Sequence, residues 1–182
     1  FVGSVADYFR DQSDGRFDLQ FDVKGPYTLG TQATYGGNDD SGSDKDARGM
    51  VREACLKAYN DGVDFSPYDW DGDGYVEEVF VLYAGRGEAT GGGANTVWPH
   101  KWNLASPLQV GSTKVSIYAC SNELRTESTY MGIGTICHEF SHCLGYPDMY
   151  DTRGNSGASN TFYGMGTWDL MCSGSYNGNE FC

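Results

Sequence analysis

The segment TICHEFSHCLGYPD, residues 135–148, contains His138 and His142 with Glu139 between them, and the chain has one other histidine. Positions i and i+4 of an α-helix differ by only about 40° around the axis, so both imidazoles leave the same face. Two imidazoles on one face bind a zinc ion, and the intervening glutamate lies beside the metal. The spacing therefore predicts a zinc-binding helix.

The residues after this helix predict a third ligand. Gly145 and Pro147 should end the helix, because glycine favours the left-handed C-terminal cap and proline cannot continue the hydrogen-bond ladder. The chain then turns back and brings Asp148 to the metal as an anionic ligand, which completes the pattern H-E-x-x-H-x-x-G-x-x-D. His100 is the alternative ligand, although a structural role is favoured for it, and Asp151 is a candidate hydrogen-bond partner for a ligand histidine.

This pattern resembles the zinc signature of the metzincin clan of metallopeptidases, with aspartate where most members have a third histidine. GTWDLMCSG, residues 166–174, resembles the methionine turn of the clan. YDWDGDGYV (68–76) and TVWPH (96–100) are similar to segments of the immune inhibitor A family, the M6 family of secreted bacterial peptidases. The likeness runs in order from Gly3 to Gly174, nearly the whole chain.

The resemblance implies a fold. It is an α+β, metzincin-like zincin: a twisted mixed sheet with a backing helix and a zinc-binding active-site helix, then a small irregular C-terminal subdomain with a methionine turn. Residues 1–182 would form a single catalytic domain, divided into an N-terminal subdomain (1–145) and a C-terminal subdomain (146–182), which could be a truncated one.

Residues and resemblance together predict a zinc-dependent endopeptidase. Three protein ligands leave the fourth zinc position open for a water molecule, whose pKa the metal lowers. Glu139 would take a proton from this water as general base and pass it to the leaving amine. By family likeness, Met171 packs beneath the metal as a structural residue. Tyr176 is a candidate to stabilise the oxyanion, although some metzincins place this tyrosine closer to the methionine.

The composition excludes some partners and favours an extracellular setting. A net charge of −13 argues against binding to nucleic acid or to anionic membranes, which needs a basic patch. The sequence contains no run of about 18 apolar residues, so no membrane span is expected. The 182 residues suit one domain, and the 26 glycines suit a loop-rich secreted protein. The predicted partners are protein or peptide substrates, and a monomer is expected.

Six cysteines allow 15 pairings, and the helix excludes one of them. Cys137 and Cys143 would lie about 9 Å apart along the helix axis, beyond the reach of a disulfide. Cys172 and Cys182 have a spacing that allows a loop staple. An oxidising compartment with disulfide bonds is favoured over a cytosolic thiol protein.

A second metal site is predicted in the loop DWDGDGYVEE, residues 69–78. Carboxylates at alternate positions followed by glycine form the oxygen-rich turn that calcium prefers. An ordinary EF-hand is excluded, because the twelfth loop position is Phe80 instead of glutamate. The alternative is a charged turn without an ion. The candidate calcium ligands are Asp69, Asp71, Asp73, Tyr75, Glu77 and Glu78.

Apolar periodicity predicts further helices and strands. Helices are expected at residues 4–10, capped by Ser4, and at 44–60. Strands are expected at 17–24, 76–84 and 115–119, and a polar loop at 30–46.

Two other functions remain open. One is a catalytically degenerate, peptidase-like domain that is stabilised by calcium and binds a protein or carbohydrate. The other is a zinc hydrolase that acts on a non-peptide amide. The chain begins at Phe1 without an initiator methionine. We therefore expect a mature or excised unit, from which a pro-segment has been removed or accessory domains are missing.

Overall fold

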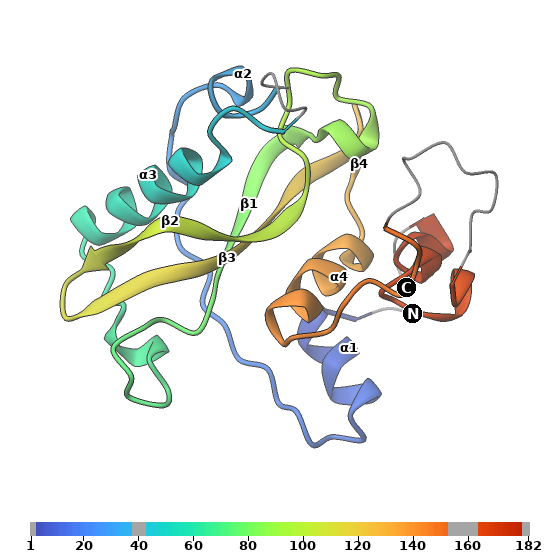
Figure 1. The fold of residues 1–182 in the computed structure, drawn as a ribbon, viewed down its shortest axis with the longest axis horizontal. Helices are drawn as coiled ribbons and strands as arrows, with labels where there is room; N and C mark the ends of the chain where they lie inside the picture. The colour runs from blue at the N-terminus through green and yellow to red at the C-terminus, as the bar shows by residue number, and fades with distance from the viewer. Residues whose placement is uncertain (1–2, 38–42, 153–163, 180–182) are drawn as a thin grey trace. The chain divides into compact units, whose positions relative to one another are not determined.

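The computed structural model describes residues 3–37, 43–152 and 164–179. It has helices and a mixed β-sheet (Figure 1), which confirms the predicted α+β class. The helices are α1 (Val5–Gln12), α2 (Gln32–Tyr35), α3 (Ala47–Asn60) and α4 (Ile133–Cys143). The strands are β1 (Val79–Arg86), β2 (His100–Val110), β3 (Thr113–Thr126) and β4 (Thr129–Tyr130). Short 3-10 helices are η1 (Ser66–Tyr68), η2 (Glu88–Thr90), η3 (Gly166–Trp168) and η4 (Ser173–Asn179).

The chain folds into two compact units. The sheet unit is continuous, from Asp22 to Tyr130, and the helical unit combines Phe1–Phe21 with Met131–Cys182. The helical unit therefore contains α1, α4, η3 and η4. The predicted subdomain boundary between residues 145 and 146 is a different division, and it stays a prediction.

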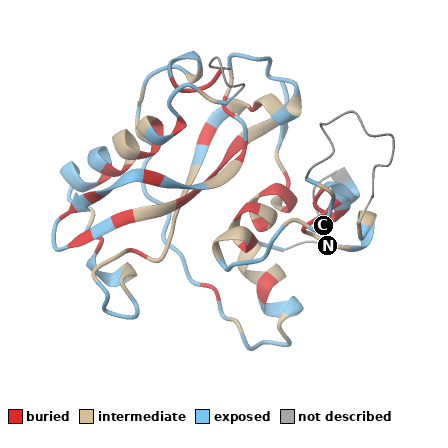
Figure 2. Cartoon of the chain, in the orientation of Figure 1, coloured by how far each residue is buried: buried red, intermediate tan, exposed pale blue. Residues whose placement is uncertain are grey.

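The sheet unit is built around β3. Its strand order is β1-β3-β2, with β4 also paired to β3. The β1–β3 pair is parallel and the β2–β3 pair is antiparallel, so the sheet is mixed. Helix α3 packs beside β2 (Figure 1), and buried positions recur along both α3 and β3 (Figure 2). Among the most deeply buried side chains of this core are Val51, Val97, Val115 and Tyr118.

Helices α1 and α3 confirm two predicted helices and show why they begin where they do. Ser4 caps α1 in a reciprocal capping box with Asp7, which satisfies two backbone N–H groups at the helix start. Asp46 caps α3 by accepting a hydrogen bond from the backbone N–H of Gly49. The apolar face of α3 then supplies Met50, Val51 and other residues to the sheet core.

The predicted strand at residues 17–24 is wrong. The segment alternates apolar and polar residues, but it pairs with no strand among the described residues. Leu19 is buried in the core of the helical unit, whereas Phe21 and Val23 are 56% and 86% exposed. Alternation alone does not form a strand, because the backbone groups need a neighbouring ladder.

Other differences concern the extent of elements. The polar loop predicted at 30–46 contains α2, and its residues 38–42 lie outside the described residues. Strand β1 begins three residues later than predicted, and β3 starts two residues before and ends seven residues after the predicted 115–119. Strand β2 was not predicted. Its sequence includes a proline, which argues against a strand, and the structure places that proline where the pairing with β3 is irregular, between Asn103 and Leu108.

The helical unit has its own apolar core, which fixes the orientation of α4. Phe9 of α1 packs against Phe140 of α4, with ring centroids 5.1 Å apart. Cys137 is fully buried in the same cluster together with Leu19. Because this face of α4 packs in the core, the face that carries His138 remains available to bind a metal.

The described residues contain a buried free thiol at Cys55, so the six cysteines do not form three disulfides within this chain. The staple predicted between Cys172 and Cys182 cannot be located, since Cys182 lies outside the described residues. None of the described helices combines the length and apolar character that a membrane crossing requires.

Candidate metal centre

Helix α4 ends as predicted, and its end directs the chain back toward the histidines. Gly145 has a φ of +95°, a left-handed conformation that glycine adopts without steric cost. Its N–H donates to the carbonyl of His142 (3.1 Å), and the N–H of Tyr146 donates to the carbonyl of Ser141 (3.1 Å). These two bonds close the last helical turn, and the following residues turn back to Asp148.

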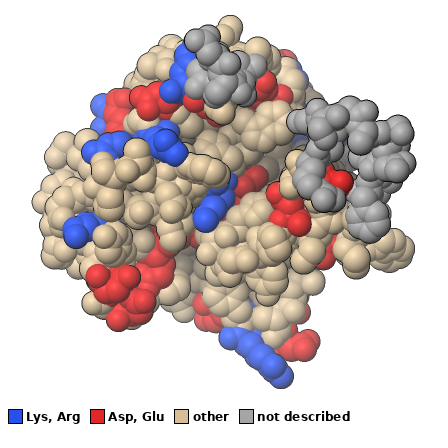
Figure 3. Space-filling model, in the orientation of Figure 1, with Lys and Arg blue, Asp and Glu red and all other residues tan. Residues whose placement is uncertain are grey.

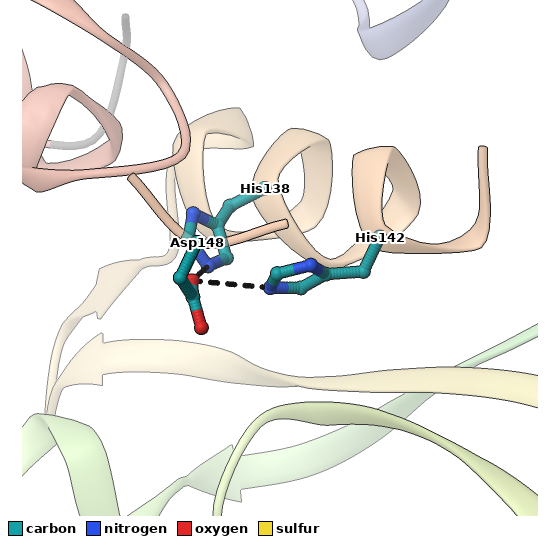
Figure 4. A group of neighbouring side chains, drawn as sticks. All are labelled: His138, His142 and Asp148. Atoms are coloured by element: carbon teal, nitrogen blue, oxygen red, sulfur yellow. Dashed lines mark ion pairs between the residues drawn. The ribbon is translucent and has the colours of Figure 1, made fainter. Parts of the chain in front are cut away.

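Three side chains converge at this turn. Asp148 Oδ1 lies 3.3 Å from His138 Nε2 and 3.3 Å from His142 Nε2. The two nitrogens and the oxygen all lie within 4.8 Å of one another. Figure 4 shows both imidazoles directed at the carboxylate from α4. The side chains are largely but not fully buried, so the group remains open to solvent on one side.

The other nitrogen of each ring is held by a backbone carbonyl. His138 Nδ1 lies 2.8 Å from the oxygen of Leu170, and His142 Nδ1 lies 2.7 Å from the oxygen of Tyr146. A carbonyl only accepts hydrogen bonds, so each Nδ1 carries the proton that it donates. A metal-bound imidazole is neutral, so this arrangement leaves both Nε2 atoms as the ones that bind a metal. Asp151 was a candidate hydrogen-bond partner for a ligand histidine, but backbone carbonyls occupy that position at both rings.

This donor set fits a zinc ion. Asp148 Oδ1 is buried without a hydrogen-bond partner, and the Nε2 atoms of both imidazoles lie 3.3 Å from it. If both rings are neutral with Nδ1 protonated, the Nε2 lone pairs and the carboxylate repel one another unless a cation lies among them. Two neutral imidazoles and one carboxylate are typical of a catalytic zinc site, which keeps a fourth position for solvent. His138, His142 and Asp148 are the residues that could hold the ion.

Glu139 and Tyr150 lie beside this group. Glu139 is buried, with an exposed fraction of 8%. Burial raises the pKa of Tyr150 to about 12, with further contributions from the charge of Asp148 and a hydrogen bond to it. The charge of Glu139 and, more weakly, Tyr176 also raise this pKa, so all four residues belong to one neighbourhood. Sequence reasoning missed Tyr150; its position just after the third predicted ligand was the only signal.

The segment around Met171 forms a tight turn that contacts the site through backbone atoms. Met171 is buried, and its N–H donates to Asp169 Oδ1 (2.7 Å). Its carbonyl accepts from the N–H of Met149 at 2.8 Å, which ties the turn to the residue after Asp148. The carbonyl of Leu170 orients His138. Tyr176 follows in η4 and is 60% exposed.

His100 lies in the sheet unit, and its hydrogen bonds account for both ring nitrogens. Nδ1 lies 2.6 Å from the Trp98 carbonyl, to which it donates, and Nε2 lies 2.9 Å from the Tyr118 hydroxyl. With Nδ1 protonated, Nε2 accepts the proton of this buried hydroxyl. These contacts agree with the structural role favoured for His100.

A second group of carboxylates lies in the sheet unit, in the loop between η1 and β1, where Figure 3 shows acidic side chains gathered. Ligand atoms of Asp69, Asp71 and Asp73 lie within 4.8 Å of one another. Glu77 Oε1 accepts from the N–H groups of Trp70 (2.9 Å) and Asp71 (3.2 Å), and thereby braces the loop. Tyr75 lies beneath Lys114, whose Nζ is 5.3 Å from the ring centroid. Tyr75, Glu77 and Glu78 stay predicted ligands.

Comparison with known proteins identifies the family. The family model "Immune inhibitor A peptidase M6, catalytic domain" matches residues 1–181, so the chain belongs to this family. This confirms the resemblance seen in the sequence.

Curated relatives are metalloproteases of the same family. The chain is 28% identical over 200 residues to the pre-pro-metalloprotease PrtV of Vibrio cholerae, with 96% of this chain aligned. It is 27% identical over 208 residues to immune inhibitor A of Bacillus thuringiensis, with 97% of this chain aligned. The chain spans only 21% of PrtV and 29% of immune inhibitor A.

Proposed function

We propose that this chain is the catalytic domain of a secreted zinc-dependent endopeptidase of the metzincin type. The observation that carries the proposal is the convergence of one carboxylate oxygen on the Nε2 atoms of two imidazoles, each at 3.3 Å. Membership of the M6 family supports the same reaction class. In this proposal the ligands are His138, His142 and Asp148, in the pattern H-E-x-x-H-x-x-G-x-x-D.

The chain's own residues perform distinct tasks in this reaction. When bound, zinc supplies a positive charge that polarises a carbonyl group and lowers the pKa of water. Glu139 follows the first ligand in α4, where its carboxylate takes a proton from the attacking water. It then returns this proton to the leaving amine. Carbonyls of Leu170 and Tyr146 keep each ligand ring in the tautomer that presents Nε2.

We assign supporting roles to two further residues. The turn from Asp169 to Gly174 is proposed as a methionine turn, in which Met171 packs as a structural residue and does not bind the metal. Tyr176 is a candidate donor to the oxyanion, since it is exposed and lies near Tyr150. An oxyanion donor must reach substrate from a solvent-accessible position, and Tyr176 meets that condition.

Calcium binding in the Asp69–Asp73 loop is proposed as a stabilising feature. Three carboxylates within 4.8 Å repel one another without a counter-ion, and oxygen ligands suit calcium. The backbone hydrogen bonds that Glu77 accepts hold the loop in its turned conformation. The alternative, a charged turn without an ion, predicts no effect of calcium on stability.

The proposed substrates are proteins or peptides, and secretion as a monomer is proposed from the acidic composition and the family. The relatives are much longer than this chain, so accessory domains or a pro-segment belong to the proposed context. The name pre-pro-metalloprotease indicates a pro-segment in PrtV.

A combined measurement of zinc content and casein cleavage tests the proposal. Wild-type protein should contain one zinc ion and cleave casein, and Glu139→Gln should keep the zinc and lose cleavage by a factor of about 10² or more. A wild type that holds zinc and cleaves nothing would favour the degenerate binding domain. Hydrolysis of small N-acyl amides without casein cleavage would favour the non-peptide amidase.

A further inference from the structure

Strand β2 forms one edge of the sheet. In the order β1-β3-β2 it pairs with β3 alone, so its other side has no strand partner among the residues that the structure describes. An edge strand presents unpaired N–H and C=O groups, which can pair with a strand of another chain. This edge is also partly apolar, since Trp102 is 56% exposed. A protein that stays monomeric has to cover such an edge.

Two arginines of α3 bond to the backbone of this strand. Helix α3 packs beside β2 (Figure 1), and Arg48 and Arg52 lie four residues apart, so their side chains leave the same face of the helix. Arg48 Nε donates to the carbonyl of Asn103 at 3.0 Å. A terminal nitrogen of Arg52 donates to the carbonyl of Ser106 at 3.1 Å. The helix thus occupies two backbone acceptors of the edge strand.

These bonds lie where the pairing of β2 is interrupted. Its register with β3 shifts between Asn103 and Leu108, and residues 104–107 have no partner in that register. Pro107 in this stretch carries no N–H group. Ser106 falls within the interruption, and its carbonyl accepts its hydrogen bond from α3. Without the arginine, this carbonyl would be an open acceptor at the edge of the sheet.

Arg48 also shields an aromatic side chain of the edge. Its Cζ lies 6.0 Å from the centroid of the Trp102 ring, a cation–π distance. A guanidinium suits both tasks, because its N–H donors are fixed in one plane and this plane also packs on aromatic rings. Arg48 therefore covers a carbonyl and a ring that a strand of another chain would contact.

The opposite edge of the sheet is covered in a similar way at the end of β1. The pairing of β1 with β3 is irregular between Tyr83 and Arg86. Gln32 of α2 donates from Nε2 to the carbonyls of Ala84 (2.7 Å) and Arg86 (3.0 Å). A helix side chain thus occupies backbone acceptors at an irregular place on each outer strand, so the arrangement at β2 is not an isolated contact.

We propose that Arg48 and Arg52 close the β2 edge against strand pairing with a second copy of this chain, and thereby keep the protein monomeric. The proposal rests on the monomeric state proposed above, and it does not involve the metal centre. Without the arginines, two copies would pair their β2 strands antiparallel about a two-fold axis, because this arrangement places the same surface on both sides of the interface.

Size-exclusion chromatography with light scattering tests the proposal on the full chain. The wild type should keep its mass of 19.9 kDa. Arg48→Ala/Arg52→Ala should approach twice this mass as its concentration rises from the micromolar range to about 1 mM. The double substitution takes the net charge from −13 to −15, so repulsion between copies increases and cannot cause the association. Lys57→Ala is the matched control: this α3 cation pairs with Glu53 (3.8 Å), and its variant should stay monomeric.

A further substitution shows whether the edge itself associates. Ala105 is exposed in β2, and a charged side chain on an edge strand opposes pairing with another chain. Adding Ala105→Lys to the double variant should therefore restore the monomer mass. Hydrogen exchange should find the backbone amides of residues 101–106 more protected in the concentrated double variant than in the wild type, because they would lie in the new strand pair.

The outcomes separate this proposal from the proposed monomeric state. A wild type that is already dimeric overturns both. A monomeric wild type with a monomeric double variant overturns the role of the arginines alone, and so does association that Ala105→Lys does not reverse or that Lys57→Ala shows equally. Thermal unfolding of dilute samples establishes that each variant is folded. If the double variant does not fold, Arg52→Ala carries the same test, because it frees the Ser106 carbonyl.

Discussion

His138 Nδ1 lies 2.8 Å from the carbonyl oxygen of Leu170, the residue immediately before Met171. This bond joins α4 to the Met171 turn within the helical unit, across more than 30 residues of sequence. The turn thus acts on the histidine through a backbone carbonyl, while the Met171 side chain is buried. The side chain supports the turn, and the turn sets the tautomer of a proposed ligand.

Zinc should stabilise the wild-type protein through His142 and independently of His100. At a free zinc concentration 100 times the Kd, the free energy of unfolding should rise by about 2.7 kcal/mol. His142→Asn should lose this rise, because it removes a donor from the group of three. His100→Asn should keep the rise, even though its metal-free form is less stable through loss of the Tyr118 bond. Thermal melts with and without zinc measure this rise in both variants. If His100→Asn loses the zinc-dependent rise, His100 is a metal ligand.

Gly174→Ala should disturb the Met171 turn. A Cβ at this position would lie 2.5 Å from the Asp169 carbonyl oxygen, so the turn must shift. We expect a loss of about 1–3 kcal/mol in the free energy of unfolding, together with weaker zinc binding through the displaced Leu170 carbonyl. Chemical denaturation and zinc titration measure the two effects. Ser173→Ala, at the exposed neighbouring position, should show neither.

Substitutions of Met171 should follow its volume and not its sulfur chemistry. The residue is 4% exposed, so Met171→Ala should cost about 2–5 kcal/mol of unfolding free energy. Met171→Leu conserves volume and should cost less than about 1.5 kcal/mol. Zinc content should persist in the leucine variant, as measured by metal analysis. If the leucine variant is stable but holds no zinc, the sulfur is a ligand and the structural role is wrong.

Calcium should raise the melting temperature of the wild-type protein, and a chelator selective for calcium should reverse the effect. Asp71→Asn removes one charge from the group formed with Asp69 and Asp73, and should weaken or abolish the calcium response. Asp11→Asn removes an exposed charge in α1, outside the group, and should leave the response intact. An equal response in both variants would show that calcium acts elsewhere.

Cys55 should resist alkylation in the folded protein. Burial raises the pKa of its thiol from 9.0 to about 12, so the reactive thiolate is scarce at mildly alkaline pH. The pKa of this thiol is higher in the folded protein than in the unfolded protein. The stability gained by keeping the buried thiol neutral is therefore complete below pH 9 and is lost as the pH rises toward 12. Iodoacetamide labelling and peptide mass analysis should find Cys55 modified only after denaturation. Rapid labelling under native conditions would contradict its burial.

Local patterns predicted several elements because their causes are local. The start of α1 follows from the hydrogen bonds that Ser4 exchanges with Asp7, and the end of α4 follows from Gly145, whose conformation needs only neighbouring residues. The strand expected at 17–24 failed for the opposite reason. Alternation was present, but a strand exists only where another strand accepts its hydrogen bonds, and that partner is a property of the whole fold.

The sequence by itself determined that two imidazoles leave one face of α4 and that the chain turns back after it, because helical periodicity and glycine capping act over a few residues. Only the tertiary structure decided what orients those imidazoles. The carbonyl of Leu170, which lies 2.8 Å from His138 Nδ1, comes from a turn that is distant in the sequence. Such contacts depend on where packing places the backbone, and a short motif does not encode that.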